Sequence, residues 1–456
     1  MEKLLLAIGV FVIALFTGCV KEMTPENVSQ ELPASSVKQS LTDLRRPYMP
    51  HRVLVKFKKS TGTEKRQRAL GLVSGKLKEM VYTQMMKETG EEGVYVLDTP
   101  LEVKLAIEKM KASPDVEYVE PDYLVTAAAT TSDPYYTGGE LWGLNSSSYS
   151  TKAYSAWKND HTGSQSVYVG IIDQGVQVNH PDLQSNVWVN PYDKPDGIDN
   201  DGNGYIDDVN GWDFWNNDNT VYDGGATGTE DHHGTHVAGT IGARSNGNGV
   251  VGMNWKVTMI SCKFMGPQGG YVSGAIKALD YLTDLKKRKG LRIVATNNSW
   301  GGGGYSQAMY DAIERSNAAN ILFVVAAGNG GADAIGDDND LTASYPSGYT
   351  NANVIAVAAM TSSGARSSFS NYGKTSVDIA APGSDILSTI AGGAYGYLSG
   401  TSMATPHVTG ACALYAASRS SATAATIKSA ILSKGTSTTA FSGKTVTGKR
   451  LTVSSF

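Results

Sequence analysis

The amino-acid sequence predicts an α/β protein with a doubly wound, mainly parallel sheet, preceded by a small α+β domain. Downstream of residue 160, apolar runs such as 167–173 and 321–327 alternate with longer stretches that can form helices, as buried parallel strands joined by helices do. Between residues 51 and 125 the strand-like runs are shorter and alternate in polarity. The 456 residues, 41% of them hydrophobic, suffice for one large and one smaller domain.

Composition narrows the class of protein. The formal net charge is −4 and 18% of the residues are charged, so nothing is basic enough to predict nucleic-acid binding. The three cysteines, Cys19, Cys262 and Cys412, are an odd, sparse set that does not predict a disulfide framework. Cys262 and Cys412 lie in apolar runs, and we expect both to be buried free thiols.

The N-terminus predicts an exported protein. Residues 1–18 carry Lys3 and then an apolar run, 4–16, which is too short to span a bilayer comfortably and is typical of a signal peptide. The end of this segment resembles the lipobox of bacterial lipoproteins, which implies a lipid anchor on Cys19. An ordinary secretory signal with an incidental cysteine is the alternative. Residues 19–50 are polar and are expected to form a flexible tether.

The small domain, residues 51–126, alternates strands and helices. We expect strands at 51–57, 76–82, 93–98 and 116–121, and helices at 63–73 and 101–112. In the second helix Val103, Ala106 and Met110 share one face. The order β-α-β-β-α-β is that of the split βαβ fold.

The large domain, residues 127–456, carries longer elements. We expect strands at 167–173, 257–264, 292–299, 321–327, 354–359 and 377–381, and helices at 153–158, 235–243, 274–287, 402–417 and 424–432. Open α/β sheets place functional groups where their strands end. Asp173 ends the first of these strands.

Ser402 lies in the segment Gly400-Thr-Ser-Met-Ala-Thr-Pro-His-Val408, which begins a helix of small residues. A serine at a helix start lies among unpaired backbone N–H groups, which can stabilise an oxyanion formed when its hydroxyl attacks a carbonyl. We place Pro406 in the first helical turn, where its missing N–H costs little. An ordinary N-cap serine is the alternative.

A serine nucleophile needs a base and an orienting carboxylate. Asp173 and the histidines of Asp231-His-His-Gly-Thr-His236 supply both types of group, in the chain order Asp, His, Ser. His232 and His236 also stand four apart, as in a zinc-protease helix, but that motif needs a Glu where this chain has His233. We therefore favour nucleophilic catalysis over a zinc site.

These motifs, together with Ala326-Ala-Gly-Asn329, resemble those of the subtilisin-like serine proteases (subtilases, peptidase S8 family) from about residue 133 to the C-terminus. The resemblance implies a subtilisin-like fold and a serine endopeptidase in which Ser402 attacks, His233 is the general base and Asp173 orients it. The Asn329 amide and the Ser402 N–H would form the oxyanion hole. The family usually has Ser or Thr where this chain has Gln174.

The resemblance also implies a peptide channel whose exposed backbone would pair with the substrate as an added strand. Its two walls and the floor of the first specificity pocket would be formed by Gly270, Ser299, Trp300, Gly301, Ala326, Ala327 and Gly328. The loop 333–340 carries four acids near that pocket. It could favour basic side chains, bind calcium or be a solvated loop, and we expect the last.

The small domain is similar in place and pattern to the ferredoxin-like propeptides of subtilases. This implies an inhibitor and folding chaperone whose tail, 121–126, runs through the active site. Cleavage within 127–134 would then release a catalytic domain, so the chain would be a self-processing zymogen. A permanent accessory domain is the alternative.

Two segments predict structural calcium. By the resemblance, Asp182 and Asn246 are ligands of a family site, and their oxygens suit this hard cation. The segment 197–208 resembles the front of an EF-hand loop, although Asn210 replaces the last Glu and an acidic surface loop is the alternative. Its candidate ligands are Asp199, Asp201, Asn203, Asp207 and Asp208.

We therefore predict an exported, monomeric serine protease of the cell envelope, either a surface or outer-membrane lipoprotein or a released enzyme. Its partners would be protein substrates, its own propeptide and, through Cys19, a membrane. One alternative is a catalytically inactive relative that binds peptides in the same groove, although all three catalytic residues are present. Another is an esterase, although the Gly-x-Ser-x-Gly elbow is absent around Ser402.

Overall fold

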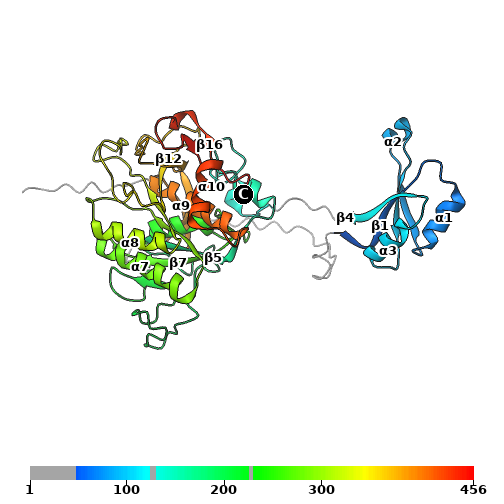
Figure 1. Ribbon diagram of the computed structural model, residues 1–456. Helices are drawn as coiled ribbons and strands as arrows, with labels where there is room; N and C mark the ends of the chain where they lie inside the picture. The colour runs from blue at the N-terminus through cyan, green and yellow to red at the C-terminus, as the bar shows by residue number, and fades with distance from the viewer. Residues whose placement is uncertain (1–47, 124–129, 225–229) are drawn as a thin grey trace, which may run out of the picture. The chain divides into compact units, whose positions relative to one another are not determined.

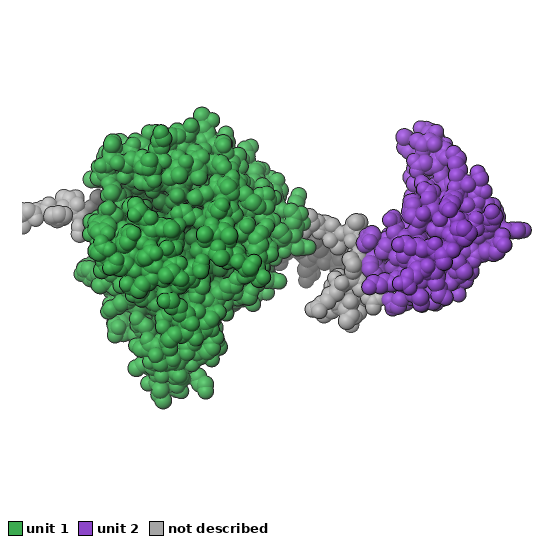
Figure 2. Space-filling model, viewed as in Figure 1, with its two compact units in different colours: residues 1–26, 128–456 green, residues 27–127 purple. Residues whose placement is uncertain are grey.

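The computed structural model describes residues 48–123, 130–224 and 230–456 (Figure 1). These residues fall into two compact units, one within 27–127 and the other within 128–456 (Figure 2). Cys19, the predicted signal segment and nearly all of the predicted tether lie outside the described residues. None of the helices in the described ranges is long and apolar enough to cross a membrane.

The small unit is an antiparallel sheet with the strand order β2-β3-β1-β4. Val53 and Leu97 from the strands and Met110 from α3 are fully buried in one apolar cluster. The predicted β-α-β-β-α-β elements are all present, with one additional short helix between the second and third strands. The elements are β1 (Tyr48–Phe57), α1 (Thr63–Gly71), β2 (Lys76–Val81), α2 (Gln84–Thr89), β3 (Val94–Asp98), α3 (Val103–Lys111) and β4 (Val116–Tyr123).

The short helix α2 was not predicted. None of its side chains is buried, so it lacks the apolar periodicity from which the other helices were inferred. Its ends do carry signals: Thr83 accepts a hydrogen bond from Met86 N at 3.3 Å, and Gly90 ends the helix with φ 68°.

The large unit is built on a nine-stranded sheet with the order β16-β17-β13-β12-β11-β10-β5-β7-β6. Neighbouring strands run parallel except for β16 and β17 at one edge, as the predicted fold class requires. The strands are β5 (Gly163–Asp173), β6 (Gly211–Asp213), β7 (Lys256–Lys263), β10 (Ile293–Asn298), β11 (Leu322–Ala326), β12 (Val354–Met360), β13 (Ile379–Pro382), β16 (Thr436–Ser437) and β17 (Lys449–Arg450). Two small ribbons pair β8 (Met265–Gly266) with β9 (Gly269–Gly270) and β14 (Ile386–Ile390) with β15 (Ala394–Leu398).

Helices cover both faces of this sheet (Figure 1). Successive residues of β5 point to opposite faces, so Ile171 joins the apolar cluster that includes α6 and α9, and Ile172 joins the cluster that includes α7 and α8. Cys262 and Cys412 are buried free thiols, as expected. The helices are α4 (Pro134–Thr137), α5 (Ala153–Trp157), α6 (His232–Gly242), α7 (Val272–Lys289), α8 (Gln307–Ala318), α9 (Thr401–Ala417), α10 (Ala424–Lys434) and the 3₁₀ turn η2 (Thr439–Phe441); α8 was not predicted.

Strand β5 is the point at which the strand order reverses. Strand β7 pairs with one side of β5, and β10, which comes later in the chain, pairs with the other side. In open α/β sheets such a switch point leaves a crevice beyond the carboxyl ends of the strands. Asp173, the last residue of β5, lies at this position.

Candidate active site

Asp173 and His233 meet at the switch point. The carboxylate Oδ1 of Asp173 accepts a hydrogen bond from His233 Nδ1 at 2.8 Å and one from the backbone N–H of Gln174 at 2.7 Å. His233 stands in the first turn of α6, next to Gly234. A Cβ on Gly234 would lie 2.1 Å from the Gly175 carbonyl oxygen, so only glycine lets α6 approach β5 this closely.

The electrostatics of the pair suit a general base. Asp173 is fully buried, whereas the His233 side chain is 27% exposed. Burial disfavours the imidazolium, but the charge of Asp173 and its hydrogen bond outweigh this effect and raise the pKa of His233. The carboxylate thus makes the imidazole a stronger base, while the ring remains accessible to a substrate.

The two oxygens of the Asp173 carboxylate differ in their partners. Within the described part of the chain, the second oxygen, Oδ2, is buried without a hydrogen-bond partner. The next residue, Gln174, donates only its backbone N–H, and it does so to Oδ1. The carboxylate is thus held through Oδ1 alone.

Ser402 is the second residue of α9 and exchanges two hydrogen bonds with Ser299. Its Oγ donates to Ser299 O at 3.1 Å, and Ser299 Oγ donates to Ser402 O at 2.8 Å. The expectation for Pro406 was wrong: it lies inside the helix, beyond the first turn, where it cannot donate to Ser402 O. Ser299 Oγ supplies the donor that Pro406 lacks.

Asn329 follows β11 and is oriented by Thr401, a residue that the sequence reasoning missed. Asn329 Oδ1 accepts hydrogen bonds from Thr401 N and Thr401 Oγ1, both at 2.8 Å. The Nδ2 end is left beside the nucleophile: a Cβ on Gly400 would lie 3.5 Å from Asn329 Nδ2 and 3.7 Å from Ser402 Cβ. The adjacency of Thr401 to Ser402 was the available signal.

Most of the predicted substrate residues meet in one pocket of about 410 Å³. Three of the predicted residues do not line this pocket. Ser299 and Ala327 are buried beneath it, and Gly270 is exposed on the β8–β9 ribbon. The predicted residues that line the pocket are Ser402, Asn329, Trp300, Gly301, Ala326 and Gly328.

A buried lysine lies behind the Asp173–His233 pair. Lys263, at the end of β7, donates to the Gln174 carbonyl and to Asp231 Oδ1, both at 2.6 Å, and lies 3.2 Å from Asp223 Oδ2. Lys263 and Asp231 are almost fully buried. Burial lowers the pKa of Lys263, but the hydrogen bond and charge of Asp231 outweigh this and raise it. The pair fastens the start of α6 to the ends of β5 and β7.

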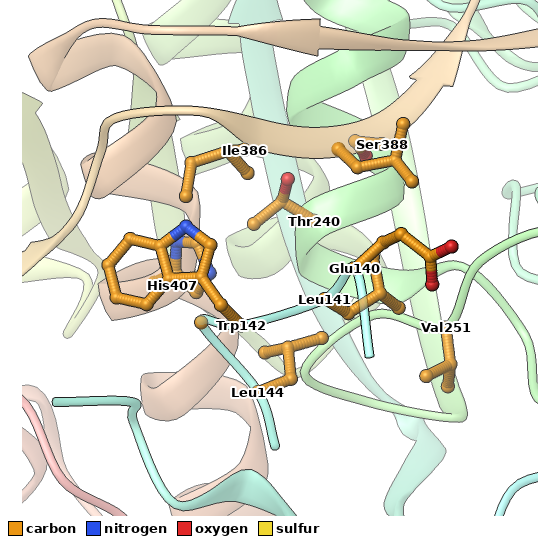
Figure 3. Close-up of a pocket in the computed structure, with 11 residues that line it drawn as sticks. Glu140, Leu141, Trp142, Leu144, Thr240, Val251, Ile386, Ser388 and His407 are labelled. Carbon is orange, nitrogen blue, oxygen red and sulfur yellow. The ribbon is translucent and has the colours of Figure 1, made fainter. Parts of the chain in front are cut away.

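The other buried histidines do not resemble catalytic bases. His236 Nε2 donates to Ile386 O at 2.8 Å, and burial lowers the pKa of His236 to about 3. His407 borders a separate pocket with Thr240 and Ile386 (Figure 3). That pocket holds about 10 Å³, roughly the space that one water needs, so it is a packing gap and not a substrate site.

Asp182 and Asn246 come together as predicted, and Asp133 joins them. Asp182 accepts hydrogen bonds from Asn246 Nδ2 at 3.1 Å and from Val250 N at 3.0 Å. Asp133 accepts from the N–H groups of Asn246 and Gly247. Burial raises the pKa of both carboxyls, that of Asp182 to about 6. Sequence reasoning missed Asp133, which lies far away in the chain.

The side chains of the predicted EF-hand-like loop point in different directions. Asp199 accepts three backbone N–H groups of its own turn, and Asp207 accepts those of residues 196 and 197. Asp208 is buried and accepts from Tyr281 and Asn203. Asp201 and Asn203 accept N–H groups two residues ahead. Across the described ranges, no three His, Cys, Asp or Glu side chains form a group that could hold a metal.

The chain belongs to the subtilase family. Residues 164–448 match the family model for Peptidase S8, the subtilase family, and residues 35–122 match the model of the fervidolysin N-terminal prodomain. The fold, the site and these matches together define a subtilisin-like serine protease with an N-terminal prodomain.

Individual relatives agree with this assignment. A thermophilic serine proteinase of Bacillus sp. (strain AK1) is 31% identical over 89% of this chain and 86% of its own. An extracellular basic protease of Dichelobacter nodosus is 33% identical over 80% of this chain, which spans 62% of that relative's length. Among solved structures, fervidolysin from Fervidobacterium pennivorans matches 89% of this chain and 60% of its own with a TM-score of 0.54 at 24% identity, which supports the fold. A protease of Pseudoalteromonas arctica PAMC 21717 matches 71% of this chain and 97% of its own with a TM-score of 0.55 at 26% identity.

Substitution of Lys263 by Met is expected to destabilise the catalytic unit, because it leaves the Asp231 carboxylate buried without its cation. Breaking a buried ion pair in this way costs about 3–5 kcal/mol. Urea unfolding of the variant in a Ser402→Ala background, which prevents self-digestion, measures the loss.

Arg315→Met is the matched control, because it breaks an exposed ion pair with Asp280. Such a surface pair is worth at most about 1 kcal/mol. Equal losses in the two variants would show that the Lys263 pair has no special structural role.

Proposed function

We propose that the protein is an endopeptidase that cleaves peptide bonds through Asp173, His233 and Ser402. The observation that carries the proposal is the 2.8 Å hydrogen bond between Asp173 and His233, at the same end of the sheet as the pocket lined by Ser402 and Asn329. Three groups of this kind perform nucleophilic acyl transfer when the histidine lies between the carboxylate and the serine.

The reaction starts when the Ser402 hydroxyl leaves the Ser299 carbonyl and turns toward His233. His233 Nε2 takes the hydroxyl proton as Oγ attacks the scissile carbonyl, and Asp173 stabilises the imidazolium through Nδ1–H. His233 returns the proton to the leaving amine, which gives an acyl-enzyme. A water then attacks the ester: His233 takes the water's proton and returns it to Ser402 Oγ, and the acid product leaves.

Two hydrogen-bond donors, Asn329 Nδ2 and the Ser402 backbone N–H, stabilise the negative charge on the tetrahedral intermediate. Asn329 Nδ2 is held beside Ser402 because Thr401 occupies the carbonyl end of the amide. The N–H of Ser402 belongs to the first turn of α9, where backbone donors lack helical partners. Fixed donors of this kind favour the transition state over the ground state because they need no reorganisation.

Substrate binding is proposed to use the main chain of an extended peptide. Gly301 is exposed at the pocket and Gly270 is exposed on the β8–β9 ribbon, so both can offer backbone groups to an added strand. This favours an endopeptidase over an esterase with a pocket for small esters. A catalytically inactive, peptide-binding relative stays the alternative that the experiment below tests.

The chain is proposed to be made as an exported zymogen. The prodomain match supports an inhibitory segment, and the relatives described as extracellular proteases support export. Self-cleavage is proposed between residues 127 and 134. Anchoring through Cys19 in the cell envelope, and a monomeric state, are likewise proposals from the sequence.

Structural calcium is proposed at Asp133, Asp182 and Asn246. Burial, with a smaller contribution from the charge of Asp133, raises the pKa of Asp182, and a divalent cation with oxygen ligands would stabilise both carboxylates. The two carboxylates suit the ion, and Asn246 would complete the set by turning its Oδ1, which now accepts from Asn248 N, toward them. Binding at the loop 199–208 requires Asp207 and Asp208 to leave their present partners, and calcium there remains a prediction.

The proposed function is tested with purified residues 20–456, a fluorophosphonate probe and N-terminal sequencing. We expect covalent labelling of the parent and a new N-terminus between residues 127 and 134, with neither event in the Ser402→Ala variant. Absence of labelling after the prodomain has been cut away by another protease, with calcium supplied, would support the inactive, peptide-binding alternative.

Removal of calcium is expected to lower the melting temperature of the Ser402→Ala protein, because an ion that binds only the folded state stabilises it by about 2.7 kcal/mol at a hundredfold excess over Kd. Calorimetry with chelator and then with added Ca²⁺ measures the effect. The Asp182→Asn variant should be insensitive to both. An equal response of the two proteins would exclude Asp182 as a ligand.

A further inference from the structure

The pocket beside Ser402 contains one charged side chain. Asp337 lines it together with Ser402 and Asn329, and among the described residues of its lining Asp337 alone is charged at neutral pH. The remainder of the lining consists of glycine, alanine, hydroxyl, amide and aromatic residues. A substrate side chain that enters this pocket therefore meets a single negative charge.

The backbone of Asp337 is held by a hydrogen bond to the side chain of Asn371. Asn371 Oδ1 accepts hydrogen bonds from Asp337 N at 2.9 Å and from Gly330 N at 2.8 Å, and Asn371 N donates to Gly328 O at 2.9 Å. One buried side chain thus ties the Asp337 backbone to the segment that carries Asn329. These bonds hold the backbone of Asp337 close to the segment that carries Asn329.

A second side-chain amide, that of Asn339, extends this hydrogen-bond network. Asn371 Nδ2 donates to Asn339 Oδ1 at 2.9 Å, and Asn339 Nδ2 donates to Ala327 O at 2.9 Å. Asn339 and Asn371 are both almost fully buried. The backbone N–H of Asp337 is therefore linked to the Ala327 carbonyl through the side chains of Asn371 and Asn339.

The other acids of this loop have different roles. Asp333 and Asp338 each accept a backbone N–H two residues ahead, and Asp340 accepts from Thr375 and Ser376. The carboxylate of Asp337 has no such partner within the described residues. Asp337 is exposed, as expected of the solvated loop that the sequence favoured, but it is the one acid of this loop that lines the pocket.

We propose that Asp337 makes the enzyme select a basic side chain, Arg or Lys, at the residue whose carbonyl Ser402 attacks. The inference rests on the proposed function. The side chain next to the attacked carbonyl enters the pocket that Ser402 and Asn329 border, and its cation gains a charge-assisted hydrogen bond to an otherwise unpaired carboxylate. Because Asp337 is exposed, solvent screens the pair and the preference is moderate.

The test uses the mature enzyme with its active sites counted by the fluorophosphonate probe. The substrates are peptides that differ only at the residue before the scissile bond, which is Arg, Lys, Gln, Leu or Glu. We expect kcat/KM for Arg to exceed that for Gln by about three- to fivefold, as one exposed, solvent-screened ion pair allows. The ratio is expected to fall toward one in Asp337→Asn and as the salt concentration rises.

Asp333→Asn is the matched control, because Asp333 lies in the same loop outside the pocket, and it should keep the parent ratio. Asp337→Lys should reverse the order of Arg and Glu. An Arg:Gln ratio that is the same in parent and Asp337→Asn, or a basic preference that appears only on the leaving-group side, would overturn the proposal. Failure of probe labelling would instead contradict the proposed function, so the two failures are distinguishable.

Discussion

The hydrogen bond between Asp173 and His233 is the interaction on which the active site depends. It joins the end of β5 to the start of α6, so its length is set by how closely a helix can approach a strand. Gly234 removes the Cβ that would meet the Gly175 carbonyl. The buried ammonium of Lys263 donates charge-assisted hydrogen bonds to the Gln174 carbonyl and to Asp231, and so links the end of β5 to the start of α6.

Hydrogen bonds from neighbouring residues position the nucleophile Ser402 and the side-chain amide of Asn329. Ser299 and Ser402 each bond to the other's carbonyl, and Thr401 takes both acceptor positions on the Asn329 oxygen. Ser299 therefore holds Ser402, and Thr401, the residue before Ser402, holds the amide of Asn329.

Much of this architecture could be predicted from the sequence. The central strands are continuous apolar runs because parallel strands are buried on both faces, and the segments around Asp173, His233 and Ser402 keep the family motifs. What escaped prediction depends on contacts between distant segments. Pro406 leaves the Ser402 carbonyl without a helical donor, and Ser299, which follows β10, supplies one. Asp133 similarly needs the loop at Asn246.

The same limit applies to charge. Lys263 ends an apolar strand, and only the fold shows that Asp231 is close enough to neutralise it. In the loop 333–340 the sequence presents four similar acids, whereas the structure gives Asp337 alone to the pocket. Sequence pattern identifies which residue types are present, but packing decides which of them lie close together.

The most direct test of the account is histidine ¹⁵N NMR of the mature enzyme across a pH series, with His233→Gln used to assign the resonance. We expect His233 to carry its neutral-state proton on Nδ1 and to titrate above its ordinary pKa of about 6.5. In Asp173→Asn the raising influence is lost while burial remains, so the pKa of His233 should fall below that value. A His233 pKa that is unchanged by Asp173→Asn would contradict the claim that this hydrogen bond organises the site.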